Sequence, residues 1–173
     1  FENPVLGLLV GMILTSIIQS SSASVGILQA LSMTRLVTFA SAIPIIMGQN
    51  IGTCVTAIIS SIGVEKNGKR AALIHLYFNI IGTVVFMTVF YVLHFMVNFD
   101  FMKETILPIN IATIHSIFNI STTLMLLPFS KYLIKLSVIS IPEKHDEMME
   151  EKKKIHENIK LLDEIFLENP HFA

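Results

Sequence analysis

A cluster of hydroxyl and amide side chains interrupts one of the most apolar stretches of the chain. Within the segment IIQSSSASVG, residues 17–26, the polar side chains are Gln19, Ser20, Ser21, Ser22 and Ser24. In hydrocarbon an unsatisfied polar group is costly, so a polar run at membrane depth must face protein, water or a ligand. The cluster is therefore a candidate binding site.

A second apolar stretch contains a similar group of neutral oxygens, and Thr15 precedes the first group. The members of the second group are Gln49, Asn50, Thr53 and Thr56. From Asn3 to Phe99 the only carboxylate side chain is that of Glu65, which disfavours a proton relay through Asp or Glu. Hydroxyl, amide and carbonyl oxygens can replace the hydration shell of a hard cation, and sodium is the natural candidate.

Helix breaks at the two clusters would add a site for an anion. A helix that starts after a break directs unpaired N–H groups and the positive end of its dipole toward that break. We expect such starts near Ser22 and Thr53. Broken helices of this kind are typical of secondary transporters, so the pattern predicts cation-coupled anion transport.

Two matching pairs of histidine and asparagine lie forty residues apart, in the segments HLYFN and HSIFN. Each pair has the i, i+4 spacing that places both side chains on one helical face: His75 with Asn79, and His115 with Asn119. No third ligand follows at metal spacing, which argues against a zinc or catalytic site. We expect all four residues to support the site by hydrogen-bonding the exposed backbone of the breaks.

The composition is that of a membrane protein. Of 173 residues, 53% are hydrophobic and 14% are charged, and the mean hydropathy is +0.69. Soluble domains carry about 25% charged residues. The net charge of −1 and the absence of a basic stripe exclude nucleic acid as a partner. Cys54 is the single cysteine, so no disulfide framework can form within the chain, and neither an enzyme activity nor a cofactor is expected.

The apolar segments predict four membrane elements. Residues 4–33 are long enough for two half-length helices and favour a re-entrant hairpin, although a single crossing remains an alternative that would move the amino end to the other side. Residues 37–63 predict one crossing helix with an unwound middle, since Pro44, Gly48 and Gly52 can interrupt it. After a turn at residues 64–70, residues 71–97 and 106–129 predict continuous crossings. We expect Gly7 and Gly11 to serve helix packing.

Charge divides the chain near Pro142. Residues 1–142 hold seven Lys or Arg and four Asp or Glu, whereas residues 143–173 hold five and nine. The second part predicts a solvated helix with an apolar seam formed by Ile155, Ile159, Leu162 and Phe166. Basic residues near residues 66–70 and in the tail are two crossings apart, which predicts a multi-pass protein of the cell membrane with a cytoplasmic tail. The first residue is Phe, which favours a piece of a longer protein.

Several segments together resemble the bacterial type II sodium/phosphate cotransporters over about residues 4–129. The segments are QSSSAS (19–24), GILQALS (26–32), GQNIGTCVTAIISSIG (48–63), KRAALIHLYFNIIG (69–82) and HSIFN. The resemblance implies an all-α membrane fold in which two inverted repeats enclose a site for sodium and inorganic phosphate. Only one QSSS is present, and the resemblance is to the second repeat. The first repeat, or another copy of the chain, would then complete the site within the lipid bilayer.

The resemblance also implies roles for particular residues. Gln19, Ser20, Ser21 and Ser22 would bind phosphate and sodium, and Asn50 and Thr53 would line the opposing break. Sodium would be held through Gln19, Ser21, Ser22 and Thr53. The tail is similar to the start of a PhoU-like cytoplasmic helical domain.

Two other functions compete with coupled transport. In the first, the chain is a non-transporting membrane module whose tail recruits a partner while the polar breaks merely pack. In the second, it is a passive channel, for which flux would be neither saturable nor dependent on sodium.

Overall fold

The described part of the chain is helical. The computed structural model describes residues 3–142, 153 and 155–160, in which the only extended pairing is an isolated bridge between Thr38 and Thr105. This confirms the expectation of an all-α protein. Contacts divide the chain into two units, Phe1–Ser137 and Val138–Ala173. In the second unit, residues 155–160 are helical and exposed, and the rest of the predicted seam, Leu162 and Phe166, lies outside the described residues.

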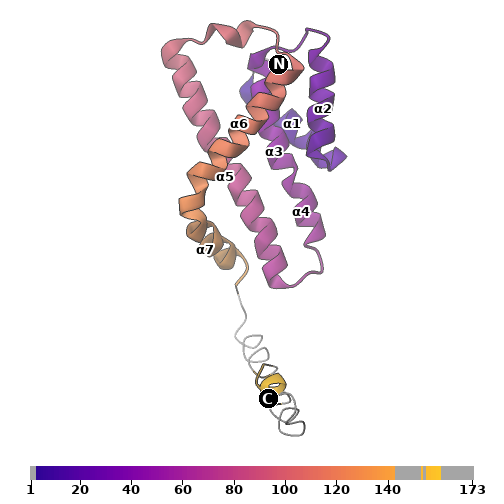
Figure 1. Cartoon of the computed structure of the whole chain (residues 1–173), viewed down its shortest axis with the longest axis vertical. Helices are drawn as coiled ribbons and strands as arrows, with labels where there is room; N and C mark the ends of the chain where they lie inside the picture. Colours follow the sequence, from indigo (N-terminus) through magenta and orange to yellow (C-terminus); the bar gives the residue numbers. More distant parts are fainter. Residues whose placement is uncertain (1–2, 143–152, 154, 161–173) are drawn as a thin grey trace, which may run out of the picture. The chain divides into compact units, whose positions relative to one another are not determined.

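The first two helices form a hairpin. Helix α1 (Pro4–Ile18) ends at Gln19, whose left-handed backbone (φ 57°) allows the chain to reverse, and α2 (Ser21–Ser32) returns beside α1 (Figure 1). Ser20 caps α2 by accepting a hydrogen bond from the amide of Ala23 at 3.3 Å. At 1.5 Å per residue neither helix reaches the roughly 30 Å of a hydrocarbon core. The structure therefore has the hairpin rather than the single crossing.

Glycines bring α1 and α3 (Phe39–Gly52) into backbone contact. A Cβ atom on Gly11 would collide with the carbonyl oxygen of Ile45, and one on Gly48 would collide with that of Leu8. Small residues permit such close approach between membrane helices, because no side chain separates the backbones. The expected packing role of the first G-x-x-x-G motif is confirmed, and the motif at Gly48 packs in the same way.

The predicted unwound middle of residues 37–63 is not observed. Helix α3 continues through Pro44 and Gly48, and α4 (Cys54–Ser60) follows after Thr53, whose φ and ψ of −62° and −25° remain helical. The amide of Thr53 still bonds the carbonyl of Gln49 at 3.2 Å. Pro44 costs α3 one backbone hydrogen bond, but its ring is buried against Gly7, and this packing holds the helix together.

The later helices differ from the prediction at their ends. Helix α5 (Lys66–Val97) begins before the expected residue 71, because the carbonyl of Glu65 accepts hydrogen bonds from the amides of Gly68 and Lys69. Helix α6 (Pro108–Leu126) begins two residues after the expected position 106. It continues through the 3₁₀ turn η2 (Leu127–Phe129) into α7 (Ser130–Ser140).

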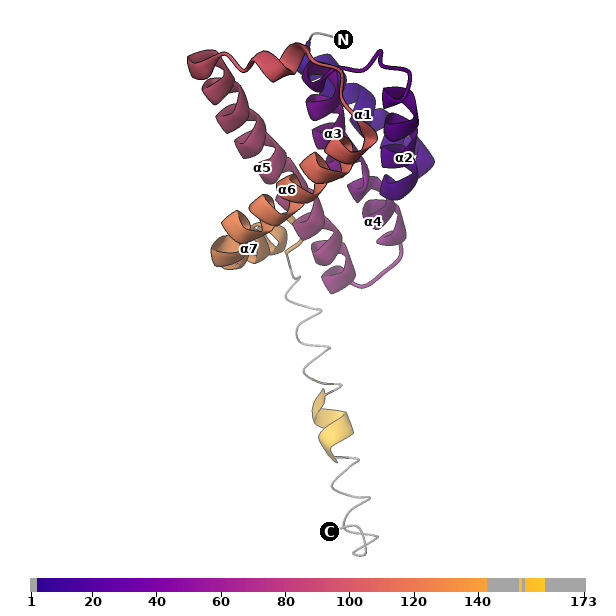
Figure 2. The same ribbon diagram turned by 45° about the horizontal axis from the view of Figure 1, so that its top comes forward.

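A short segment after α5 is hydrogen-bonded to the start of α3. After α5 the chain forms the 3₁₀ turn η1 (Asp100–Lys103) and pairs with the residues just before α3. The amide of Phe39 donates to Glu104 O at 3.1 Å, and that of Ile106 donates to Val37 O at 2.9 Å. Ile106 is thus drawn into the extended bridge, which is why α6 starts only at Pro108. Figure 2 shows η1 leading from the end of α5 across to the start of α6.

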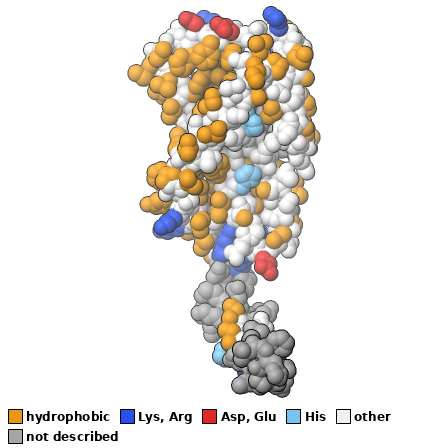
Figure 3. All heavy atoms as spheres, in the orientation of Figure 1, with side chains coloured by type: hydrophobic (Ala, Val, Ile, Leu, Met, Phe, Trp, Pro, Cys, Tyr) orange, Lys and Arg blue, Asp and Glu red, His pale blue; other side chains and the backbone are white. Residues whose placement is uncertain are grey.

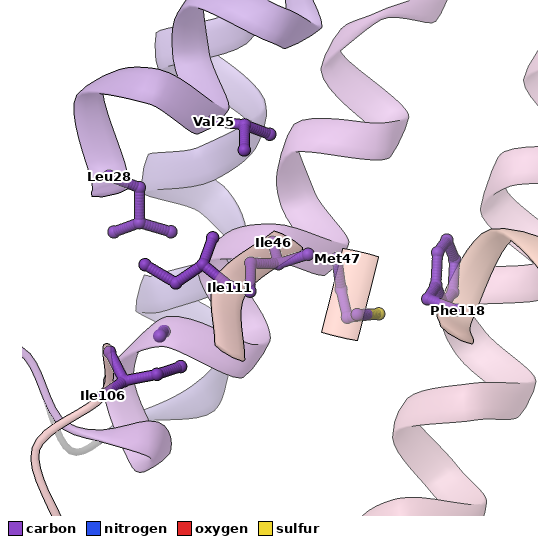
Figure 4. Packing of buried hydrophobic residues seen from close by; sticks show 8 residues of the cluster. Val25, Leu28, Ile46, Met47, Ile106, Ile111 and Phe118 are labelled. Carbon is purple, nitrogen blue, oxygen red and sulfur yellow. The ribbon is translucent and has the colours of Figure 1, made fainter. Parts of the chain in front are cut away.

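One apolar core joins the hairpin to α3 and α6. The buried members of the cluster are Val25, Leu28, Ala42, Ile46, Met47, Ile106, Ile111 and Phe118, seven of which are labelled in Figure 4. Within the part of the chain that the structure describes, three helical stretches are long and apolar enough to cross a membrane: Phe39–Ser60, Lys66–Val97 and Pro108–Ser140. On the face in Figure 3, charged side chains gather at the two ends of the membrane unit and hydrophobic ones lie between.

Candidate functional site

The tip of the α1–α2 hairpin presents polar side chains to the outside of the described unit. Gln19, Ser20 and Ser22 are exposed, and Ser21 is half-buried. The first amides of α2 lie at this tip, and the first-turn amides of a helix have no acceptor within their own helix. The tip therefore combines exposed hydroxyl and amide groups with the positive end of a helix dipole.

A buried cluster of neutral oxygens lies behind the tip. The hydroxyl of Thr15 donates to that of Ser24 at 2.6 Å, and Nε2 of Gln49 donates to the carbonyl of Ser24 at 3.0 Å. All three side chains are almost fully buried, and Oε1 of Gln49 has no partner among the described residues. Ser24, predicted with the exposed run, thus belongs to the inner cluster that fastens the hairpin to α3.

The end of α3 packs against the end of α1, just before the hairpin tip. A Cβ atom on Gly52 would lie 2.7 Å from Cβ of Thr15 and 3.2 Å from the amide nitrogen of Ser16. Thr53, the next residue, is half-buried, and its hydroxyl donates to the carbonyl of Asn50 at 2.6 Å. The packing of α1 on α3 therefore brings Thr15 and Ser24 beside Gln49 and the end of α3.

Asn50 is the link from α3 to α6. Its Oδ1 lies 3.3 Å from Nε2 of His115 and accepts from Nδ2 of Asn119 at 3.2 Å, while its own Nδ2 donates to the carbonyl of Ile46 at 2.8 Å. Its side chain is therefore engaged on every side by the protein. His115 and Asn119 were expected to bond the backbone of a break. They reach a side chain instead, because the helix at Asn50 is not unwound.

The pair on α5 is used differently. The His75 side chain is exposed, and only its backbone carbonyl joins the packing, accepting from Asn79 Nδ2 at 2.9 Å and from Cys54 Sγ at 3.6 Å. Thr56, on α4, is half-buried. In the described residues, no group of three His, Cys, Asp or Glu is placed to hold a metal ion.

Sequence reasoning missed one contact that positions the hairpin. Nε2 of Gln29, on α2, donates to the carbonyl of Pro108 at 3.1 Å and thereby fixes α2 to the start of α6. The sequence shows that Pro108 lacks an amide hydrogen and suits the first position of a helix. Nothing near Pro108 in the sequence indicates that α2 would supply a donor to its carbonyl.

Comparisons with known proteins give one consistent result. Residues 1–140 match the family model described as Na+/Pi-cotransporter. An uncharacterized protein of Bacillus subtilis, YqeW, is 33% identical over 140 residues, covering 79% of this chain and 44% of that protein. The human sodium-dependent phosphate transport protein 2B is 38% identical over 101 residues, covering 55% and 15% respectively.

Further relatives carry similar names. The sodium-dependent phosphate transport protein 2A of the rat is 42% identical over 90 residues, covering 49% of this chain and 14% of that protein. This chain spans less than half the length of each of these relatives. No solved structure matches it.

Proposed function

The chain belongs to the Na+/Pi-cotransporter family, and on that premise we propose that it supplies one half of the binding site of a sodium-coupled symporter for inorganic phosphate. The observation that carries the proposal is the exposed polar tip of Gln19 to Ser22 in front of a buried cluster of neutral oxygens. Such a tip in a membrane unit needs a ligand, water or protein against it. The relatives whose names state a function are transport proteins and not enzymes.

Phosphate would bind at the start of α2. The first-turn amides other than that of Ala23, and the hydroxyls of Ser20, Ser21 and Ser22, offer hydrogen-bond donors, and the helix dipole favours an anion there. No arginine or lysine is needed for this step. The binding of phosphate would therefore depend on backbone geometry, which Gln19 sets by its left-handed conformation.

Sodium would bind between the hairpin tip and the end of α3. Gln19, Ser21, Ser22 and Thr53 would provide amide and hydroxyl oxygens, and Gln49, which bonds Ser24 behind the tip, has an Oε1 without a partner among the described residues. Because no carboxylate belongs to the site, a bound cation would attract the phosphate anion that follows. Binding of sodium before phosphate would couple the two gradients, and rocking of the filled site between the two sides would complete transport.

The other half of the site would come from outside this chain. A first inverted repeat, elsewhere in the complete protein, or another copy of the chain would cover the exposed tip. Residues 143–173 would form a PhoU-like helical tail on the cytoplasmic side of the cell membrane, in agreement with the basic residues at 66–70.

The test is labelled phosphate uptake into proteoliposomes that contain the complete protein. Uptake should be saturable and should require an inward sodium gradient. Gln19→Ala should lower it about tenfold or more, since a hydrogen bond to a charged ligand contributes about 1.5–3 kcal/mol. Thr34→Ala is the control, because Thr34 is an exposed polar residue just past the other end of α2 and its hydroxyl bonds only the neighbouring backbone at Leu31 and Leu36.

The result separates the competing functions. Uptake that depends neither on a sodium gradient nor on Gln19 would refute the coupled site and leave the passive channel. A protein that keeps its fold and a tail partner, but shows no uptake in wild-type form, would be the non-transporting module.

A further inference from the structure

Helix α7 lies beyond the length of helix that a membrane crossing requires. The 19 residues of α6 extend about 28 Å at 1.5 Å per residue, close to the roughly 30 Å of a hydrocarbon core. The chain then turns at η2, which contains Pro128, and α7 does not continue along the axis of α6 (Figures 1 and 2). The side chains of α7 therefore decide whether it lies in hydrocarbon, in water or at the surface between them.

The outward face of α7 is basic. Leu133 and Ser137 are buried, so they mark the side of the helix that packs against protein. Lys131 and Lys135 each lie two residues before one of them, which is about 200° around an α-helix. Both lysines are exposed. They are one turn apart and point away from the packed side.

Two apolar side chains flank the lysines. Tyr132 lies on one side of them and is 70% exposed, and Ile134 lies on the other side and is 52% exposed. Tyrosine is enriched where a membrane meets water. A lysine beside apolar groups can lay its methylene stem on hydrocarbon while its ammonium reaches the level of the headgroups. Lysines and apolar residues on the exposed surface of one helix are typical of a helix that lies in a membrane surface.

Positive charge gathers at the end of the membrane unit where α7 lies. The start of α5 lies at this end as well (Figures 1 and 2). Residues 61–70 and 130–137 hold five Lys or Arg and one acidic residue, Glu65. At the opposite end, residues 33–38 and 98–107 hold two basic and two acidic residues. Basic residues at a membrane surface attract anionic headgroups. An anionic lipid surface therefore satisfies both the lysines and the apolar flanks of α7.

We propose that α7 lies along the membrane surface and that Lys131 and Lys135 bind the phosphate groups of anionic phospholipids. Tyr132 and Ile134 would contact the glycerol and acyl region beside them. Lys69, exposed near the start of α5, would add to the attraction. This surface shares no residue with the hairpin tip and is independent of the proposed transport site.

The first experiment follows the thermal stability of the delipidated complete protein in detergent. Phosphatidylglycerol should raise the melting temperature more than phosphatidylcholine with the same acyl chains, because a bound ligand stabilises the folded state by mass action. In the double variant Lys131→Gln/Lys135→Gln, the phosphatidylglycerol concentration for half of the effect should rise roughly twentyfold. The matched control is Arg35→Gln/Lys103→Gln, which removes two exposed positive charges at the opposite end and should respond as the wild type does.

Three outcomes would overturn the lipid site. They are an equal response to the two lipids, an equal loss of response in the two double variants, and a wild-type response of Lys131→Gln/Lys135→Gln. Inorganic phosphate is a further addition. A rise in melting temperature with inorganic phosphate that depends on the two lysines and equals the rise with phosphatidylglycerol would overturn the lipid as the source.

A second experiment measures the depth of α7 in the membrane. Ile134→Cys, in a background without other cysteines, is labelled with a nitroxide in bilayers that contain phosphatidylglycerol. Oxygen, which concentrates in hydrocarbon, should reach this label more than a water-soluble nickel chelate does. Glu65→Cys, in an exposed turn, should show the reverse. A label at residue 134 that is reached mainly by nickel would place α7 in water, and one reached by neither reagent would place it against protein. Either result would overturn the proposal.

Discussion

Asn50 holds two membrane helices together through a single side chain. It accepts hydrogen bonds from His115 and Asn119 on α6 and donates one to its own helix. Inside a membrane these bonds are modest, with an average near 0.6 kcal/mol, because the unfolded segments find other partners. Their value is positional: they fix the end of α3 relative to α6.

A double-mutant cycle tests this link. Asn119→Ala and Asn50→Ala should each destabilise the complete protein by about 0.5–1.5 kcal/mol, and the double variant by less than the sum, with a coupling of roughly 0.5 kcal/mol or more. Unfolding free energies in mixed micelles measure the effect. Asn110→Ala is the matched control on α6, and additive losses in the Asn50–Asn119 cycle would contradict the link.

The candidate site depends on the contact between helices α1 and α3. Gly11 and Gly48 let the two backbones touch, and this contact places Thr15 and Ser24 beside Gln49 and Gly52. The hairpin is short and lacks a full span, so its position is set by packing and not by the membrane alone. Any change that separates α1 from α3 should displace the polar tip.

Gly48→Ala tests the contact between α1 and α3 directly. Its added Cβ would overlap the carbonyl oxygen of Leu8, and overpacking of this kind costs about 1–3 kcal/mol. Thermal unfolding should show a clear loss of stability. Gly26→Ala is the control, because no atom lies within 4 Å of the added carbon, and the same change there should be neutral or stabilising. Equal effects of the two substitutions would refute the close contact.

At the scale of the whole membrane unit, the face shown in Figure 3 has charged side chains at its two ends and hydrophobic side chains between them. The polar tip of the hairpin is the exception, since it is exposed in a chain that spans less than half the length of its matched relatives. If the tip lies at membrane depth, protein, water or a ligand must lie against it. Glu65 directly precedes α5, and Glu104 follows η1 beyond the other end of α5.

Orientation can be measured with two matched cysteine variants. Glu65→Cys and Glu104→Cys are exposed loop changes, and Cys54→Ser provides the background, although Cys54 is buried. A membrane-impermeant maleimide should label Glu104→Cys in intact cells and Glu65→Cys only after permeabilisation, since the basic residues at 66–70 favour the cytoplasmic side. The opposite labelling would reverse the proposed orientation, including that of the tail.

The sequence by itself determined the elements and the candidate residues. Apolar length, local turn formers and the Ser-rich run are properties of neighbouring residues, and they predicted the hairpin, the later spans and the tip at Gln19 to Ser22. The family resemblance rested on the same local motifs. The helix ends were less well predicted, because Asn67 and Gly68 favour a turn while the backbone bonds at Glu65 extend α5 through them.

Only the tertiary structure decided which polar groups meet. Nothing local showed that Ser24 would turn inward to Thr15 and Gln49, or that His115 and Asn119 would bond the Asn50 side chain. Likewise, Pro44 stays within α3 because Gly7 on another helix leaves space for its ring. Each outcome depends on the approach of helices distant in sequence, and that approach follows from packing, which a single segment does not contain.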